Sequence, residues 1–120
     1  MILEGTEIEG REREELIQEI RIQLDSVIAT YPEYDDIGVS IYYHQSFIRT
    51  PVFYVWLQHP VHAYKEKLFL LKNEQLTRYM RNVIHPEREE GKDMTVTDTN
   101  FSFFIMCNHD GNMYLLEKLL

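Results

Sequence analysis

The sequence predicts a small α+β domain: an N-terminal helix, an antiparallel β-hairpin, a second helix and a C-terminal β-hairpin. Apolar residues recur every three to four positions near the N-terminus, and two later runs alternate in the manner of strands. Near the C-terminus, an Asp-Gly pair separates two apolar runs. The 120 residues, 44% of them hydrophobic, suffice for one domain with a packed core. We expect a single domain over residues 1–120, with both helices on one face of a mixed or antiparallel sheet.

The first helix is predicted before Pro32, which ends it because proline lacks a backbone donor. Thr6 with Glu9 fits a capping box, in which a hydroxyl and a carboxylate satisfy free amides at a helix start. Gly10 interrupts this start, so the regular helix can begin nearer Arg11. One face of the predicted helix collects the apolar side chains, which are Leu16, Ile17, Ile20, Leu24, Val27, Ile28 and Tyr31.

Residues 37–44 and 52–58 alternate and are joined by a short polar connection, which is typical of a β-hairpin. Side chains of one parity would enter the core; they are Ile37, Val39, Ile41, Tyr43, Phe53, Val55 and Leu57. Side chains of the other parity form an aromatic face, with Tyr42, His44, Tyr54 and Trp56. An antiparallel sheet can leave such a face open.

Residues 61–85 allow two interpretations. They form one long helix, or a short buried strand at Leu68–Leu71 and then a helix that Asn73 caps and Pro86 ends. We prefer the second, because the apolar block of four residues would cover all sides of a helix. Residues 87–99 are polar and contain a glycine, so we expect a mobile loop there.

The stretch CNHDGNMY, residues 107–114, raises the question of catalysis because a histidine lies beside an aspartate. Asp110 and Gly111 are the pair that a two-residue type I′ turn favours, since both positions need positive φ. Neighbours in a tight turn rarely aim both side chains at one reacting atom. We therefore interpret His109 and Asp110 as a hairpin tip and not as a catalytic pair.

No other motif predicts catalysis. His59 and His62 lie three residues apart, but zinc needs further ligands at a matching spacing, and His44, His85 and His109 form no known signature with them. The sequence has no phosphate-cradling glycine loop, no G-x-S-x-G motif and no H-E-x-x-H motif. We predict a protein that is not an enzyme and binds no metal or cofactor, with a metal-dependent hydrolase as the third interpretation.

Cys107 is the only cysteine, so an internal disulfide is excluded, which fits a reducing compartment. It falls within an apolar run, where thiols are usually inert. The first ten residues lack the features of a signal peptide, and no apolar run is long enough to span a bilayer. We expect a soluble, cytoplasmic protein without membrane contact.

Charge is unevenly distributed in a chain whose formal net charge is −8. Residues 1–36 carry eleven acids and three bases, residues 37–86 two acids and six bases, and residues 87–120 seven acids and three bases. An acidic balance repels phosphate backbones and favours basic protein surfaces. We predict that Glu12, Glu14 and Glu15 speed the encounter with a basic surface of a partner.

The predicted function is non-catalytic protein binding, as a stoichiometric inhibitor or regulator with the profile of immunity proteins, antitoxins and phage anti-defence proteins. The aromatic face would make the contact, because Tyr and Trp are enriched at binding hot spots. A second copy of the chain is an alternative occupant of this face, which would give a homodimer. The alternative function is a small nucleic-acid-binding regulator that stacks bases on the same face and uses the basic middle segment.

Overall fold

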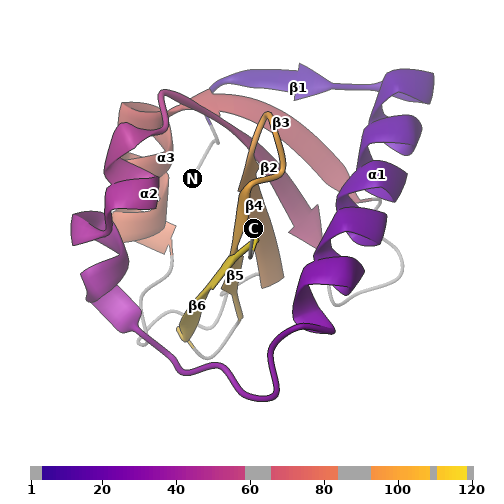
Figure 1. Ribbon diagram of the computed structural model, residues 1–120. Helices are drawn as coiled ribbons and strands as arrows, with labels where there is room; N and C mark the ends of the chain where they lie inside the picture. Colours follow the sequence, from indigo (N-terminus) through magenta and orange to yellow (C-terminus); the bar gives the residue numbers. More distant parts are fainter. Residues whose placement is uncertain (1–3, 59–65, 84–92, 109–110, 119–120) are drawn as a thin grey trace.

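The computed structural model describes residues 4–58, 66–83, 93–108 and 111–118, and it confirms the α+β class (Figure 1). Six strands form one antiparallel sheet in the order β1-β3-β2-β4-β5-β6. The strands are β1 (Thr6–Ile8), β2 (Val52–Gln58), β3 (Lys67–Lys72), β4 (Asp93–Asp98), β5 (Phe103–Cys107) and β6 (Met113–Glu117). The helices are α1 (Gly10–Ile28), the 3₁₀ helix η1 (Gly38–Tyr43), α2 (Gln45–Arg49) and α3 (Asn73–Val83).

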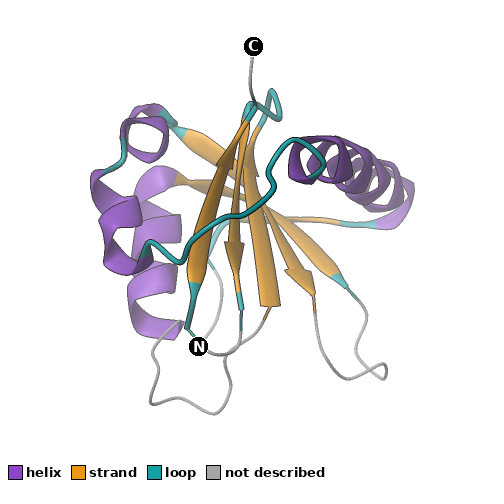
Figure 2. Cartoon of the chain, turned by 60° about the horizontal axis from the view of Figure 1, so that its bottom comes forward, coloured by secondary structure: helices purple, strands orange, loops and turns teal. Residues whose placement is uncertain are grey.

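The helices lie on both faces of the sheet, so the prediction that they share one face is wrong. Helix α1 covers one face, and η1, α2 and α3 form a layer on the other, as Figure 2 shows. The alternation of β2 explains this arrangement. Phe53 and Val55 point into the core under α2 and α3, while Trp56 points into the core under α1. Because both faces of the central strand are apolar, each needs a covering layer.

Helix α1 begins at Gly10 but not through the predicted capping box. Glu9 is the N-cap residue and its side chain makes no capping hydrogen bond. Thr6 belongs instead to β1, where it pairs with Leu70 of β3. Gly5 precedes this strand with a φ of +112°, and a Cβ at that position would lie 2.7 Å from the carbonyl oxygen of Leu70. The polar residues before α1 therefore form the edge strand β1, which joins the sheet before the helix begins.

The first predicted hairpin is wrong, because residues 38–43 form η1 while β2 pairs with β3 and β4. Asp36 explains the change. Its Oδ1 accepts hydrogen bonds from the backbone N–H groups of Gly38 and Met113, each at 2.9 Å. The N–H of Ile37 also donates to the carbonyl of Met113 at 2.8 Å. The chain is thus fixed at the edge of β6 and turns into a short helix, with Gly38 at a φ of +52°.

The split of the 61–85 region is confirmed for its described part, which contains β3 and α3. Asn73 was predicted as the N-cap of α3, but it is itself the first helical residue, so the helix starts one residue earlier than predicted. The Lys72 N–H donates to Oε1 of Gln75 at 2.9 Å, which satisfies one free donor at the helix start. The Asn73 amide instead donates to the carbonyls of Phe47 and Thr50, at 2.8 and 2.9 Å, and so ties α3 to α2.

The expected loop at 87–99 is wrong for its second half. Residues 93–98 form β4, an interior strand between β2 and β5. Its apolar residues Met94 and Val96 belong to the core beneath α2 and α3. Thr97 is fully buried, and its hydroxyl donates to the carbonyl of Phe103 at 2.8 Å. Threonine in alternation with apolar residues suits a strand, which outweighs its polar composition. Residues 87–92 lie outside the described residues.

The C-terminal hairpin is confirmed, since β5 and β6 pair from Cys107–Met113 to Phe103–Glu117. Gly111 has the expected positive φ, at 85°. Its N–H donates to the carbonyl of Asn108 at 3.0 Å, but the predicted two-residue turn at Asp110-Gly111 falls partly outside the described residues. His109 and Asp110 themselves lie outside the described residues, as do His59, His62 and His85.

Candidate functional site

The predicted open aromatic face is buried, so that prediction is wrong. Trp56 is 3% exposed and packs in the core beneath α1, and Tyr54 is half-buried against that core, with its ring stacked on Phe101. The guanidinium carbon of Arg21 lies 5.0 Å from the centroid of the Trp56 ring, and Arg21 also binds Glu66 at 2.8 Å. The Trp56 Nε1 has no hydrogen-bond partner within the described chain. Trp56 thus offers no free surface for a partner or for base stacking, and Tyr54 offers only part of its side chain.

Tyr42 and His44 lie on the opposite side of the sheet, so the four predicted contact residues are not brought together. Tyr42 packs within the α2–α3 layer, where its ring lies edge-on to the ring of Phe47 with 5.9 Å between the ring centroids. The Arg81 guanidinium carbon lies 4.9 Å from the centroid of the Tyr42 ring. Burial raises the pKa of Tyr42 to about 12, although the charge of Arg81 opposes the shift.

Glu12, Glu14 and Glu15 lie exposed on the first turns of α1. Two of these carboxylates have arginine neighbours on the same helix. Oε1 of Glu15 lies 2.9 Å from Nε of Arg11, and Oε1 of Glu14 lies 3.1 Å from Nη2 of Arg13. The side chains of Glu15 and Glu14 are 66% and 71% exposed, so both carboxylates are accessible. Their role in partner encounter stays a prediction.

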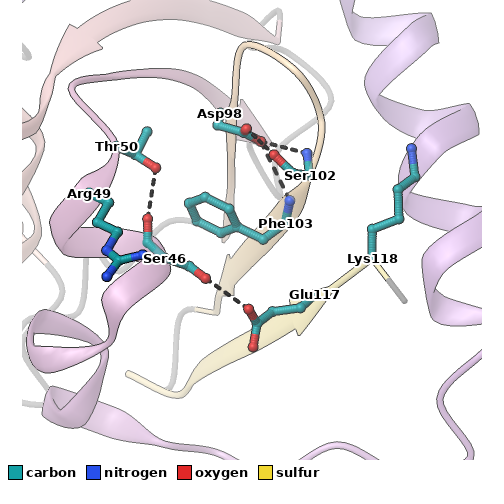
Figure 3. A pocket seen from close by; sticks show the side chains of 8 residues that line it. All are labelled: Ser46, Arg49, Thr50, Asp98, Ser102, Phe103, Glu117 and Lys118. Carbon is teal, nitrogen blue, oxygen red and sulfur yellow. Dashed lines mark hydrogen bonds between the residues drawn. The ribbon is translucent and has the colours of Figure 1, made fainter. Parts of the chain in front are cut away.

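A hollow of about 360 Å³ opens between α2 and the ends of the neighbouring strands (Figure 3). Helix α2 and the residue after it contribute one wall, and the β4–β5 turn and the end of β6 contribute the others. The lining residues are Ser46, Arg49, Thr50, Asp98, Ser102, Phe103, Glu117 and Lys118. Three hydroxyls, two carboxylates and two cations meet in this hollow, and all three kinds of group can take part in catalysis.

A histidine, a serine and a glutamate meet at one side of the hollow, but the serine hydroxyl and the histidine are not hydrogen-bonded to each other as nucleophile and base. Oγ of Ser46 donates to Oε2 of Glu117 at 2.8 Å. Nε2 of His44 lies 3.6 Å from Oε1 of the same carboxylate. Nδ1 of His44 accepts the backbone N–H of Ser46 at 3.3 Å and thereby caps α2. A histidine activates a serine when one imidazole nitrogen accepts the hydrogen of the serine hydroxyl. Here the Ser46 hydroxyl donates to Glu117, and Nδ1 of His44 accepts a backbone N–H.

The remaining carboxylate in the hollow has a structural role. Asp98 is 8% exposed, and its carboxylate accepts the backbone N–H of Ser102 at 2.6 Å, the Ser102 hydroxyl, and the N–H of Phe103 at 3.4 Å. These bonds fix the β4–β5 turn, where Phe101 adopts a φ of 55°. Asp98 therefore has little acceptor capacity left for a ligand or a substrate proton.

The two cationic side chains of the hollow, Lys118 and Arg49, differ in their hydrogen-bond partners. Nζ of Lys118 donates to Oε1 of Gln23 on α1 at 2.8 Å. Arg49 makes no side-chain hydrogen bond or ion pair with the residues that the structure describes, and its side chain is exposed. Arg49 is thus the charged group in the hollow that is free to meet another molecule.

Neither nucleophilic nor metal chemistry finds support elsewhere in the described residues. Cys107 is 4% exposed, and burial raises the pKa of its thiol to about 12, so the thiol stays protonated and unreactive. Across residues 4–58, 66–83, 93–108 and 111–118, no three His, Cys, Asp or Glu side chains are grouped to hold a metal ion. No helix in these ranges is long and apolar enough to cross a membrane.

Exposed apolar side chains gather on one short segment. Five large hydrophobic side chains are exposed in the described chain, and three of them lie within ten residues: Val39 at 70%, Tyr43 at 76% and Ile48 at 52%. We call these three residues the η1–α2 surface. Sequence reasoning missed it because alternation assigned Val39 and Tyr43 to the core. An available signal was Asp36 two residues before Gly38, the spacing of an Asx turn that can start a helix.

No protein-family model, curated protein or solved structure matches this chain. The class of protein is therefore defined by fold and surface alone: a small α+β domain with a helical layer on each side of its sheet.

Proposed function

We propose that this protein is a non-catalytic protein-binding module, which acts as an inhibitor or regulator by occupying its partner. The observation that carries the proposal is the η1–α2 surface, where Val39, Tyr43 and Ile48 are each more than half exposed within ten residues. Such a concentration of exposed apolar area is typical of interaction sites, and tyrosine is among the residues that contribute most to binding energy.

The core does not need these three side chains. The face beneath α1 and the face beneath α2 and α3 each have their own buried cluster, and the cluster beneath α2 and α3 includes Ile41 and Phe47 from the same segment. Ile41 is fully buried and Phe47 is 2% exposed. The segment thus anchors itself with one set of apolar residues and exposes another, which is the division expected of a binding surface.

The β6 edge of the sheet is protected, which argues against strand addition by a partner at that edge. The Tyr31 hydroxyl donates to the carbonyl of Glu117 at 2.8 Å and accepts the N–H of Glu117 at 2.9 Å. At the other end of β6, Asp36 and Ile37 bond both backbone groups of Met113. A partner strand would have to displace these bonds before it could pair.

The test is affinity capture with a matched control. The tagged protein is used to capture proteins from its native host, and the captured proteins are identified by mass spectrometry, purified and tested for rebinding. We expect the triple variant Val39→Ser, Tyr43→Ser, Ile48→Ser to lose at least ~10-fold in affinity, because hot-spot truncations cost ~2 kcal/mol or more. Ile22→Ser is the control, since Ile22 is 55% exposed on α1. Equal affinity of the triple variant and the control would refute the proposed surface.

A further inference from the structure

We infer that the partner bound at the η1–α2 surface presents acidic groups to it, although the chain as a whole is acidic. The inference rests on the proposed function and specifies the partner's chemistry at that site. It also reverses the sign of the partner surface that the net charge of −8 suggests.

The two helical layers carry opposite charge. Helix α1 contains five acidic residues and three arginines. The layer of η1, α2 and α3 contains Arg49, Arg78 and Arg81 against Glu74 as its one acidic residue. The exposed apolar side chains of the η1–α2 surface belong to the second, basic layer. A partner that docks on them meets the arginines of this layer and not the carboxylates of α1.

Two of these arginines, Arg49 and Arg81, can form an ion pair with a partner. Arg49 follows Ile48 directly and lines the hollow beside α2. Arg81 lies over the ring of Tyr42, whose neighbour in the chain is the exposed Tyr43. Neither arginine is paired with a carboxylate among the residues that the structure describes. Arginine beside exposed aromatic and aliphatic side chains is the composition enriched at the centres of protein interfaces.

The magnitude of the total charge selects a protein over the other polyanions. A nucleic acid or an anionic lipid surface presents many negative charges, and it would repel the acidic α1 side as well as attract two arginines. The formal charge of −8 makes that balance unfavourable. A protein can place a few carboxylates opposite Arg49 and Arg81 and leave neutral or basic groups elsewhere.

The experiment uses the purified partner that the capture identifies. We measure association rates for the wild type, Arg49→Glu, Arg81→Gln and the control Arg11→Glu, after confirming that each variant unfolds cooperatively. Arg11 suits the control because its side chain is 91% exposed on α1, remote from the proposed surface. Arg49→Glu should slow association ~3- to 10-fold at low salt, Arg81→Gln about twofold, and Arg11→Glu less than about twofold. At ~1 M salt, where the Debye length falls to ~3 Å, the rates should converge.

Each outcome separates the inference from the proposed function. Unchanged or faster association of both Arg49→Glu and Arg81→Gln would overturn the inference, while a weakened triple serine variant would leave the proposed function intact. Unchanged affinity of the triple serine variant, or failure to capture any protein that rebinds when purified, would overturn both. Binding of the wild type to vesicles containing phosphatidylserine, lost in Arg49→Glu, would identify a membrane surface and overturn the protein partner.

Discussion

Replacement of Trp56 by alanine separates a buried sheet face from an open one. Trp56 is 3% exposed, packs with Leu68 and Phe104 beneath α1, and has Arg21 stacked on its ring. Truncation of a core tryptophan costs ~3–5 kcal/mol, and loss of the cation–π contact belongs to that sum. The unpaired Nε1 lowers the expected cost, because its removal relieves a buried donor worth ~1–3 kcal/mol. We therefore expect Trp56→Ala to lower the free energy of unfolding by about 2 kcal/mol.

The measurement is urea unfolding followed by circular dichroism, with the slope of the transition checked for constancy. Trp56→Phe isolates the donor, because it keeps an aromatic ring and removes the N–H; we expect a loss of only ~1 kcal/mol. Tyr43→Ala is the aromatic control. At 76% exposure, its loss should change the free energy of unfolding by less than ~0.5 kcal/mol.

The reasoning is refuted if Trp56→Ala unfolds at the same urea concentration as the wild type but binds the purified partner at least ~10-fold more weakly. In that case α1 would leave the sheet face when the partner binds, and Trp56 would be a contact residue. We expect the opposite division of effects: Trp56→Ala loses stability, and Tyr43→Ala loses affinity.

Three further predictions concern other parts of the molecule. Gly5→Ala should lower the melting temperature and cost ~1–3 kcal/mol, because Gly5 has a φ of +112° and a Cβ would contact β3; equal melting of variant and wild type would contradict this. Burial raises the pKa of Cys107 from 9.0 to about 12, so the neutral thiol is favoured in the folded state. The contribution of the neutral thiol to stability is complete below pH 9 and is lost as the pH rises toward 12, by up to ~1.4 kcal/mol per pH unit. Cys107→Ala should flatten the pH dependence of the free energy of unfolding, which is measured at about pH 9 and 10. Replacement of Glu12, Glu14 and Glu15 by glutamine should speed association with an acidic partner by up to about threefold at low salt, whereas slower association would restore the basic partner that the net charge suggests.

Elements with one unambiguous period were predictable from the sequence. Strand β2 alternates over its whole length, and the parity of Phe53 and Val55 against Trp56 is the parity found in the structure. Helix α1 has a continuous apolar stripe, and Ile17, Ile20 and their neighbours are buried as that stripe requires. In these elements local period and tertiary packing agree, so each residue had one consistent environment.

Elements whose local pattern was overridden by contacts distant in sequence were not predictable in the same way. Residues 38–43 alternate like a strand, but Asp36 and Ile37 bond to Met113, which is 77 residues from Asp36, and this contact fixes the edge of the sheet. Residues 93–98 look like a polar loop, yet they pair with β2 on one side and with β5 on the other, and Thr97 is buried. In both cases the partners that decide the structure, Met113 and the strands β2 and β5, lie outside the segment itself.

The candidate site illustrates why an aromatic count alone does not locate a binding surface. Tyr and Trp suit a hot spot, but they also suit a sheet face beneath a helix, where large side chains fill the space between layers. The sequence did hold the information that decides between these uses. Strand β2 is apolar on both faces, and two separate helical stripes, on α1 and α3, each need a sheet face to cover. The apolar stripes of α1 and α3 cover the two apolar faces, so both sides of the sheet are buried. The binding surface that we propose therefore lies on the outer side of a helical layer, where Tyr43 and Ile48 are exposed beside Arg49.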